Sequence, residues 1–255
     1  MKKILITNDD GYESEGLLAL IDALKDLAHI TVVAPATEKS ACGHSLTLTH
    51  PLSFVGVTDD FYKLDDGTPS DCIYLALHSL FEDSKPDLVI SGINKGSNMG
   101  EDITYSGTAA GAMEGVLQGV PSIAISQVMD FEQPMGDFTL AKKAIRAVVE
   151  KIFAGTFPLK EREFININVP YDAEELQFAV TYAGYRHYGN DAHLHRNPRG
   201  LEYYWLGLHP LDFKPRDGRN RLCDFEAIVE GMVSLTPVKL DMSAYKSIKQ
   251  LEEWL

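Results

Sequence analysis

Cysteine is scarce in this sequence, and the cysteines that it has lie far apart. The chain has 255 residues, and its three cysteines, Cys42, Cys72 and Cys223, form no CxxC pair. An odd number of widely separated cysteines argues against a full disulfide framework and is typical of proteins in a reducing compartment. We therefore expect free thiols and a cytoplasmic location.

Long hydrophobic runs are also missing. The first residues, MKKILITNDD, contain two lysines but only a three-residue apolar run, too short for the hydrophobic region of a secretory signal. No segment approaches the roughly 18 apolar residues that a membrane-spanning helix needs. The sequence therefore predicts no membrane partner.

Basic residues are few relative to acidic ones. There are 23 Lys and Arg against 37 Asp and Glu, which gives a formal net charge of −14. Because nucleic-acid binding depends on Lys and Arg that neutralise phosphates, we expect no nucleic-acid partner. A small anionic substrate stays compatible, since a bound metal can reverse the local field. The length suits a single large α/β domain with a sizeable core.

Several motifs of phosphate chemistry are absent. The sequence has no P-loop GxxxxGK[ST], and no GxGxxG follows its first apolar run. Asp9 and Asp10 are adjacent, so they do not match the Asp-x-Asp pattern of phosphatases that use an aspartyl nucleophile. Among phosphoryl-transfer mechanisms, these absences leave attack by a metal-activated water as the simplest.

What the sequence does contain is an alternation of short apolar runs and amphipathic segments. Strands are expected at 3–7, 29–36, 86–94 and 120–126, and helices at 15–28 and 107–119. Apolar strands between helices indicate a parallel sheet covered on both faces, so we expect a Rossmann-like, doubly wound, mainly parallel α/β fold. Another helix should begin after Thr68, with Pro69 at its first position and Asp71 completing a capping box.

The pattern changes after about residue 155. Strands are expected at 163–171, 177–185, 201–208 and 227–238, loops at 195–200 and 209–221, and an amphipathic helix at 243–255. We expect one domain over 1–255, with a core at about 1–155 plus about 165–185. A β-rich C-terminal extension at about 186–255 would serve oligomerisation. The last helix should pack on the body or on a neighbouring subunit.

Oxygen-bearing side chains follow three of the expected strands. Asp9 and Asp10 follow the first, Ser40 lies beyond the second, and Asn94 and Asn98 follow the third. Taken singly, each has a simpler interpretation as a turn or surface residue. Because the carboxyl ends of parallel strands meet at one sheet edge, where ligands bind, together they predict an all-oxygen site for Mg²⁺ or Mn²⁺. A divalent cation would offset the repulsion between the two aspartates.

An anion cradle is expected next to this site. Ser106, Gly107 and Thr108 precede a helix of small residues, so its free N–H groups and two hydroxyls could hold a phosphate. Ordinary N-capping by Ser106 or Thr108 is the alternative. The nearby metal set favours phosphate binding.

Several separate motifs of the sequence match those of one protein family. They are NDDGY, VVAPATEKSACGHSLTL, GTPSDC, PDLVISGINKGSN, YSGTAAGAMEG, FININVP and DFEAIVEGMVSLTPVKLD. Together, in this order, they closely resemble the SurE family of stationary-phase survival proteins. The resemblance covers nearly the whole chain and is weakest at about 185–222.

This resemblance implies a phosphatase that acts on nucleoside 5′-monophosphates with one divalent cation, Mg²⁺ or Mn²⁺. Some members also cleave 3′-nucleotides or short polyphosphate. The family's metal ligands fall on Asp9, Asp10, Ser40 and Asn94, and its phosphate contacts fall on Asn98, Ser106, Gly107 and Thr108. Asp9, Asp10 and Asn98 are the expected catalytic residues. The family forms homodimers and sometimes homotetramers through its C-terminal region.

Two residues near the site are less certain matches. The family often has arginine before the metal-ligand serine, whereas this chain has Lys39, which offers a point charge but no guanidinium contact. His44 is a further candidate acid or base, although a loop histidine is more often solvated or structural.

Two other functions are weighed against a phosphatase. A phosphorylatable receiver domain also places acidic residues after its first strand, but it needs an acceptor aspartate where this chain has Asn94, and it is much shorter. A regulator that binds metal and nucleotide without turnover would keep the same site. Phosphate release from nucleoside monophosphates separates these alternatives.

Overall fold

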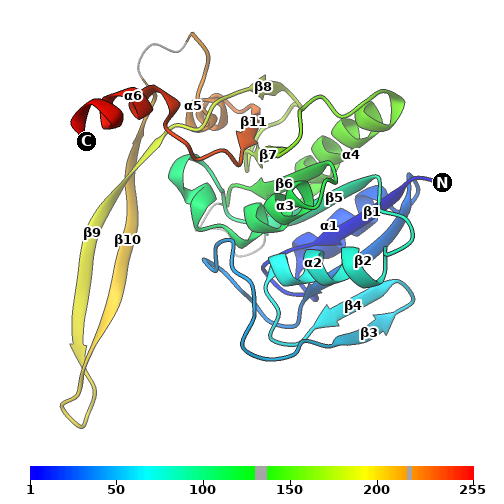
Figure 1. Ribbon diagram of the computed structural model, residues 1–255, viewed down its shortest axis with the longest axis horizontal. Coiled ribbons are helices and arrows are strands. Elements are labelled where there is room, and N and C mark those ends of the chain that lie inside the picture. The colour runs from blue at the N-terminus through cyan, green and yellow to red at the C-terminus, as the bar shows by residue number, and fades with distance from the viewer. Residues whose placement is uncertain (130–136, 217–219) are drawn as a thin grey trace.

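The centre of the structure, a computed structural model that describes residues 1–129, 137–216 and 220–255, is a nine-stranded sheet (Figure 1). The strand order is β3-β4-β2-β1-β5-β6-β7-β11-β8. The bounds are β1 (Lys3–Thr7), β2 (His29–Pro35), β3 (Phe54–Thr58), β4 (Phe61–Leu64), β5 (Leu88–Lys95), β6 (Ser122–Gln127), β7 (Glu163–Val169), β8 (Phe178–Val180) and β11 (Val233–Lys239). The strands from β4 across to β7 are parallel, and β3 and β11 pair antiparallel with β4 and β7. The expected mainly parallel α/β fold is confirmed.

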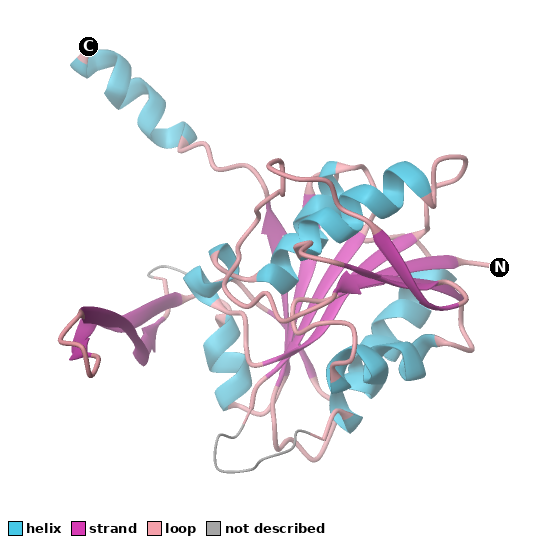
Figure 2. Cartoon of the chain, turned by 90° about the horizontal axis from the view of Figure 1, so that it is seen from below, coloured by secondary structure: helices cyan, strands magenta, loops and turns pink. Residues whose placement is uncertain are grey.

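Helices cover both faces of this sheet (Figure 2). They are α1 (Glu15–Leu24), α2 (Pro69–Ser79), α3 (Gly107–Leu117), α4 (Thr139–Ala154), α5 (Asp224–Val229) and α6 (Tyr245–Trp254), and a short 3₁₀ helix, η1 (Gly100–Thr104), precedes α3. Helices α1 and α4 share one hydrophobic cluster with the sheet, and α2 and α3 belong to two others. The arrangement is therefore three-layered, as the doubly wound pattern predicts.

The first strand shows how the sequence divides the core. Ile4 and Ile6 pack in the cluster that contains Leu17 of α1, whereas Leu5 packs with Ile73 of α2. Successive side chains of a strand point to opposite faces, so an apolar run suits a strand buried on both sides. The run ends at the carboxyl end of β1, where the polar residues of the candidate site begin.

The predicted capping box at the start of α2 is confirmed. The backbone N–H of Asp71 donates to Thr68 Oγ1 at 3.1 Å, and that of Thr68 donates to Asp71 Oδ2 at 2.9 Å. Asp71 also accepts hydrogen bonds from the backbone N–H and the hydroxyl of Thr47. The cap therefore also holds the β2–β3 loop, residues 36–53, against the body.

The second half of the chain differs from expectation in several places. The segment 227–238 was expected to be a strand, but its first residues belong to α5. The segment 209–221 was expected to be a loop, but β10 (Glu202–Lys214) continues into it and pairs with β9 (Tyr185–Arg196). The polar composition of β9 gives no alternation, so its strand depends on backbone pairing with β10. Helix α4 was not anticipated.

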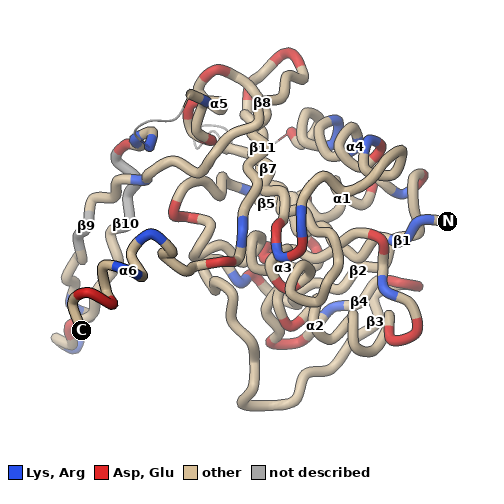
Figure 3. The backbone as a smooth tube through the Cα atoms, turned by 45° about the horizontal axis from the view of Figure 1, so that its top comes forward, with Lys and Arg blue, Asp and Glu red and all other residues tan. Residues whose placement is uncertain are grey.

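Strands β9 and β10 form a separate two-stranded sheet that extends away from the body (Figures 1 and 2). Acidic and basic residues both occur along this hairpin (Figure 3), and Tyr203, Tyr204, Trp205 and Leu206 are exposed. None of the residues of α6 is buried, so this helix does not pack on the body of its own chain. The alternative expectation, packing on a neighbouring subunit, stays a prediction.

The expected extension at 186–255 is not a separate layer. Strand β11 lies inside the main sheet, between β7 and β8, although the sequence placed it in the extension. The hairpin, α5 and α6 belong to this region but not to the main sheet. Among the helices that the structure describes, none is long and apolar enough to cross a membrane.

Candidate active site

The polar residues after β1 form a turn that positions two carboxylates. The side-chain nitrogen of Asn8 donates to the carbonyl of Gly11 at 2.9 Å and to Ser14 Oγ at 2.7 Å. Gly11 has a φ of +96°, a left-handed conformation that side chains disfavour. Asn8 and Gly11 therefore meet the structural needs of the turn, which leaves Asp9 and Asp10 available for another role.

Asp9 is buried against the N-terminus of α3. Its Oδ1 accepts a 2.5 Å hydrogen bond from the Thr108 hydroxyl, and the backbone N–H groups of Gly107 and Thr108 also donate to it. Burial raises the pKa of Asp9, and these donors lower it only in part. The side chain is held in one orientation by the helix that follows β5 and η1.

Asp10 lies at the same edge and joins the ends of β1 and β5. Its Oδ2 accepts a hydrogen bond of 3.2 Å from the backbone N–H of Lys95. Desolvation, followed by the negative charges of Asp9 and Glu38, raises the pKa of Asp10 to about 6. Three carboxylates therefore concentrate negative charge here, and a bound cation would relieve their repulsion.

Ser40 is brought to this edge by the β2–β3 loop. Its hydroxyl donates to Glu38 Oε1 at 2.7 Å. The backbone N–H of the preceding residue, Lys39, donates to the Asp9 carbonyl at 2.7 Å. Ser40 thus lies one residue from a direct contact with Asp9. The Lys39 ammonium lies 3.6 Å from Asp66 Oδ1, so its charge is shared with that carboxylate.

Asn94 lies at the carboxyl end of β5, immediately before the residue that contacts Asp10. Its side-chain nitrogen donates to the carbonyl of Gly96 at 2.8 Å. With the nitrogen bound to the loop, the side-chain oxygen is the atom that can act as a metal ligand. This is the donor that the sequence predicts for Asn94.

Asn98 is buried and held by strands β6 and β7. Its side-chain nitrogen donates to Ser126 Oγ at 2.8 Å, and its backbone N–H donates to Asn168 Oδ1 at 2.8 Å. Its carbonyl accepts hydrogen bonds from the side chains of Asn166 and Asn168 at 2.8 and 3.0 Å. Among the described residues, no hydrogen bond joins Asn98 to Asp9 or Asp10, so its catalytic role stays a prediction.

The predicted phosphate residues occupy the first turn of α3. Ser106 Oγ caps the helix by accepting the N–H of Ala109 at 2.9 Å. A Cβ placed on Gly107 would lie 2.8 Å from Asp9 Oδ2 and 2.9 Å from Cys42 Sγ, so only glycine permits this approach. Thr108 binds Asp9, as described above. The structure thus gives each of them a local role, and their contact with phosphate stays a prediction.

His44, the further candidate acid or base, has its side-chain contact with helix α3. Its Nε2 lies 2.9 Å from Glu114 Oε2, in the fourth-to-last position of α3. Glu114 is buried and has a second partner in Gln118, whose side-chain nitrogen donates to Oε1 at 2.8 Å. The pair ties the β2–β3 loop to α3.

The donor set is chemically suited to a hard divalent cation. Two carboxylates, a hydroxyl and an amide oxygen are ligands that Mg²⁺ and Mn²⁺ accept, with water completing the coordination. Across the parts of the chain that the structure describes, no group of three or more His, Cys, Asp or Glu side chains could hold a metal ion. Desolvation and the charges of Asp9 and Glu38 raise the pKa of Asp10, and a bound cation would lower it.

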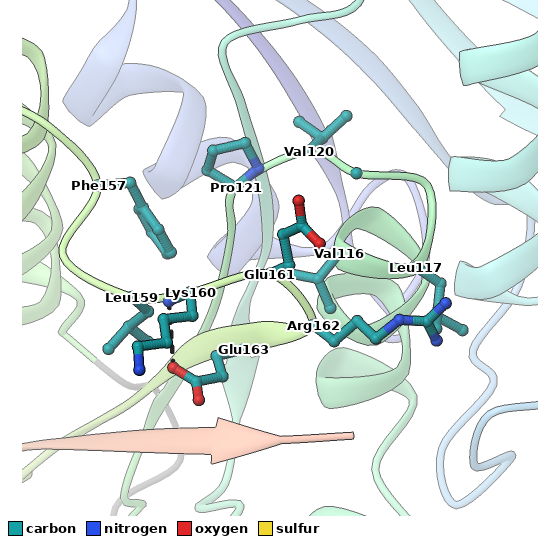
Figure 4. A pocket seen from close by; sticks show the side chains of 11 residues that line it. Val116, Leu117, Val120, Pro121, Phe157, Leu159, Lys160, Glu161, Arg162 and Glu163 are labelled. Atoms are coloured by element: carbon teal, nitrogen blue, oxygen red, sulfur yellow. Dashed lines mark hydrogen bonds between the residues drawn. The ribbon is translucent and has the colours of Figure 1, made fainter. Parts of the chain in front are cut away.

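A cavity of about 410 Å³ lies at the other end of the sheet (Figure 4). Phe157, Pro121 and Leu117 line it together with Arg162, near the amino ends of β6 and β7. Because these strands run parallel to β5, their amino ends lie opposite the edge that carries the aspartates. We assign this cavity no part in the reaction.

Sequence reasoning missed the residues that support the site. Glu38 acts on Asp10, Ser126 and Asn168 hold Asn98, and Glu114 holds His44. One signal was present: FININVP places asparagines at alternating positions of a buried strand, where an unpaired amide would be costly. Such residues need a buried polar partner.

Known proteins resemble this chain over its whole length. The SurE family model, described as "Survival protein SurE", matches residues 4–190. A protein named 5′-nucleotidase SurE from Sulfurimonas denitrificans is 67% identical over 99% of this chain and 98% of its own, and one from Helicobacter hepaticus is 63% identical over 100% and 99%. The crystal structure of SurE protein from Aquifex aeolicus superposes with a TM-score of 0.84 at 40% identity, covering 99% of both chains. This chain belongs to the SurE family.

Proposed function

We propose that this protein is a metal-dependent 5′-nucleotidase, which hydrolyses nucleoside 5′-monophosphates to nucleoside and phosphate. Full-length relatives that carry this name, at 67% and 63% identity, support the reaction class. The observation that carries the proposal is the placement of Asp9, held by the N-terminus of α3, beside Asp10 at one sheet edge. A carboxylate pair next to a helix N-terminus suits both a cation and a phosphate.

In this proposal Asp9, Asp10, Ser40 and Asn94 hold one divalent cation, Mg²⁺ or Mn²⁺. When bound, such a cation would offset the charge of the phosphate and make a water molecule more acidic. The hydrogen bonds from Thr108 and from the start of α3 keep Asp9 in position. Glu38 keeps Ser40 oriented through its 2.7 Å hydrogen bond.

The remaining residues would position the phosphate and accept a proton. The first turn of α3, at Ser106, Gly107 and Thr108, and the buried loop residue Asn98 would contact the phosphate. Of the two aspartates, Asp10 is the less buried, so it is the more accessible to the attacking water, and we assign it the role of proton acceptor.

The test is phosphate release from AMP, GMP and the pyrimidine monophosphates, with and without Mn²⁺. We expect Mn²⁺-dependent turnover that EDTA abolishes and that added Mn²⁺ or Mg²⁺ restores. 3′-Nucleotides and short polyphosphate serve as further substrates. Nucleotide binding without phosphate release would identify a non-catalytic regulator and contradict the proposal.

We also propose that the protein forms a homodimer or homotetramer through the β9–β10 hairpin and α6. The exposed side chains of Tyr204, Trp205, Leu251 and Trp254 support this, since a monomer rarely exposes so much aromatic and aliphatic surface. Light scattering on the full chain and on a chain that ends at Asp241 tests it. A monomer mass for the full chain at micromolar concentration would contradict the proposal.

A cytoplasmic location is proposed on the chemistry of the cysteines. All three are free, and Cys72 and Cys223 are buried. Buried free thiols are typical of proteins that function in a reducing compartment.

A further inference from the structure

One pair of side chains next to the active site, a histidine and a carboxylate, has no part in the mechanism above. His44 comes from the β2–β3 loop and Glu114 from α3, and their side chains are 28% and 5% exposed. His44 Nε2 lies 2.9 Å from Glu114 Oε2, and Gln118 donates to the other carboxylate oxygen. Both oxygens of a buried carboxylate are therefore engaged.

This carboxylate is in its charged form because of those partners. Burial raises the pKa of Glu114, but its hydrogen bonds to His44 and Gln118, and the charges of His44 and His78, together hold it below its usual value. A buried charge that loses a partner is strongly disfavoured, because nothing replaces the lost hydrogen bond. The contact with His44 is therefore one that the folded chain keeps.

The two elements that this pair joins are the two that build the site. The β2–β3 loop carries Ser40, and its Lys39 N–H donates to the carbonyl of Asp9 at 2.7 Å. Helix α3 carries the hydroxyl of Thr108 and the N–H groups that bind the Asp9 carboxylate. The same loop also contacts the residue before the cradle, since Gly43 N–H donates to the Tyr105 carbonyl at 2.9 Å.

We propose that His44 is a positioning residue, which braces the β2–β3 loop on α3 through Glu114 and so sets the distance between Ser40 and Asp9. The proposal rests on the nucleotidase function and the metal ligands proposed above. According to this proposal, His44 supports both the affinity for the metal and the rate of turnover. It gives His44 no contact with substrate and no proton to transfer.

The rate and the metal affinity should respond together when the brace is removed. His44→Phe keeps a ring but removes the hydrogen bond to Glu114, and Glu114→Gln keeps the shape but removes the negative charge that strengthens that bond. Loss of such a bond corresponds to roughly a 10- to 100-fold change, so the Mn²⁺ dissociation constant should rise and kcat should fall by that order. KM for AMP, measured at saturating Mn²⁺, should change less than about threefold. The double variant should be no worse than either single one, because both act on one interaction.

Two variants separate positioning from other roles. His44→Gln can still donate a hydrogen bond to Glu114 but cannot titrate, so it should recover most of the activity and keep both limbs of the wild-type pH–rate profile. His29→Phe is the matched control, because His29 Nε2 lies 3.4 Å from a carboxylate oxygen of Asp60 at the amino end of β2, the end of the sheet opposite the aspartates. It should leave kcat and Mn²⁺ affinity unchanged.

Hydrogen exchange provides a readout that does not depend on activity. The peptide that spans 37–44 should exchange faster in His44→Phe and at the wild-type rate in His44→Gln. Loss of one limb of the pH–rate profile in His44→Gln would make His44 an acid or base and overturn the proposal. Unchanged exchange and unchanged Mn²⁺ affinity in His44→Phe would also overturn it. If the wild type releases no phosphate, the nucleotidase proposal fails. Hydrogen exchange and Mn²⁺ calorimetry still test whether His44 holds the β2–β3 loop on α3.

Discussion

Replacing Gly107 by alanine tests how closely α3 approaches Asp9. The added Cβ would lie 2.7 Å from Asp9 Cβ, 2.8 Å from Asp9 Oδ2 and 2.9 Å from Cys42 Sγ, and real Cβ contacts are essentially never this short. Relaxing the nearest contact to an ordinary 3.4 Å would move Asp9 and the helix apart by about 0.7 Å. The substitution therefore displaces an expected metal ligand without changing its chemistry.

The expected losses follow from this displacement. Overpacking of this kind costs about 1–3 kcal/mol of unfolding free energy, although alanine by itself favours a helix over glycine by up to ~1 kcal/mol. A misplacement near 1 Å at reacting groups costs about 10²-fold, so we expect kcat to fall roughly 10- to 100-fold. Mn²⁺ affinity should fall as well, because Asp9 is the displaced side chain.

The assays are thermal unfolding, Mn²⁺ calorimetry and phosphate release from AMP. Gly56→Ala is the control, because nothing lies within 4 Å of a Cβ at that position in β3. Adding Cys42→Ala removes the thiol contact but not the contacts with Asp9, so it should not rescue Gly107→Ala. Full rescue by Cys42→Ala would show that the loss of activity comes from the contact with the loop at Cys42. Wild-type kcat in a folded Gly107→Ala variant would refute the prediction that the added Cβ displaces Asp9.

Three further predictions concern the aspartates. Thr108→Val removes the hydroxyl that donates to Asp9 Oδ1, so Mn²⁺ affinity should fall about 10-fold or more by calorimetry; an unchanged affinity would assign this hydroxyl to substrate alone. Asp10→Asn should lower kcat by about 10²-fold or more, with circular dichroism unchanged; wild-type turnover at limiting Mn²⁺ would contradict the metal assignment. The pKa of Asp10 is raised from 3.8 to about 6, so the folded state binds more protons between these values. The contribution of Asp10 to the unfolding free energy of the metal-free protein should therefore fall by about 2–3 kcal/mol as the pH rises from about 4 to about 7, and the difference between wild type and Asp10→Asn in urea titrations should show it.

The sequence by itself determined those features that depend on residues close together in the chain. The apolar run before Asp9 predicts a buried strand, and the spacing of Leu17, Ile21 and Leu24 predicts the helix behind it. The capping box at Thr68 is a relation between residues three positions apart. From such local patterns follow the order of strands and helices, the mainly parallel sheet, and the edge at which the polar residues gather.

Only the tertiary structure decided the partners of those residues. Thr108 reaches Asp9 across 99 positions and His44 reaches Glu114 across 70, and neither pairing leaves a signal in the intervening sequence. The length of the β9–β10 hairpin was missed for the same reason, since cross-strand backbone pairing, and not composition, makes those residues strands. Periodicity tells which side of an element is buried, whereas the contact that orients a carboxylate or braces a loop depends on which distant element packs there.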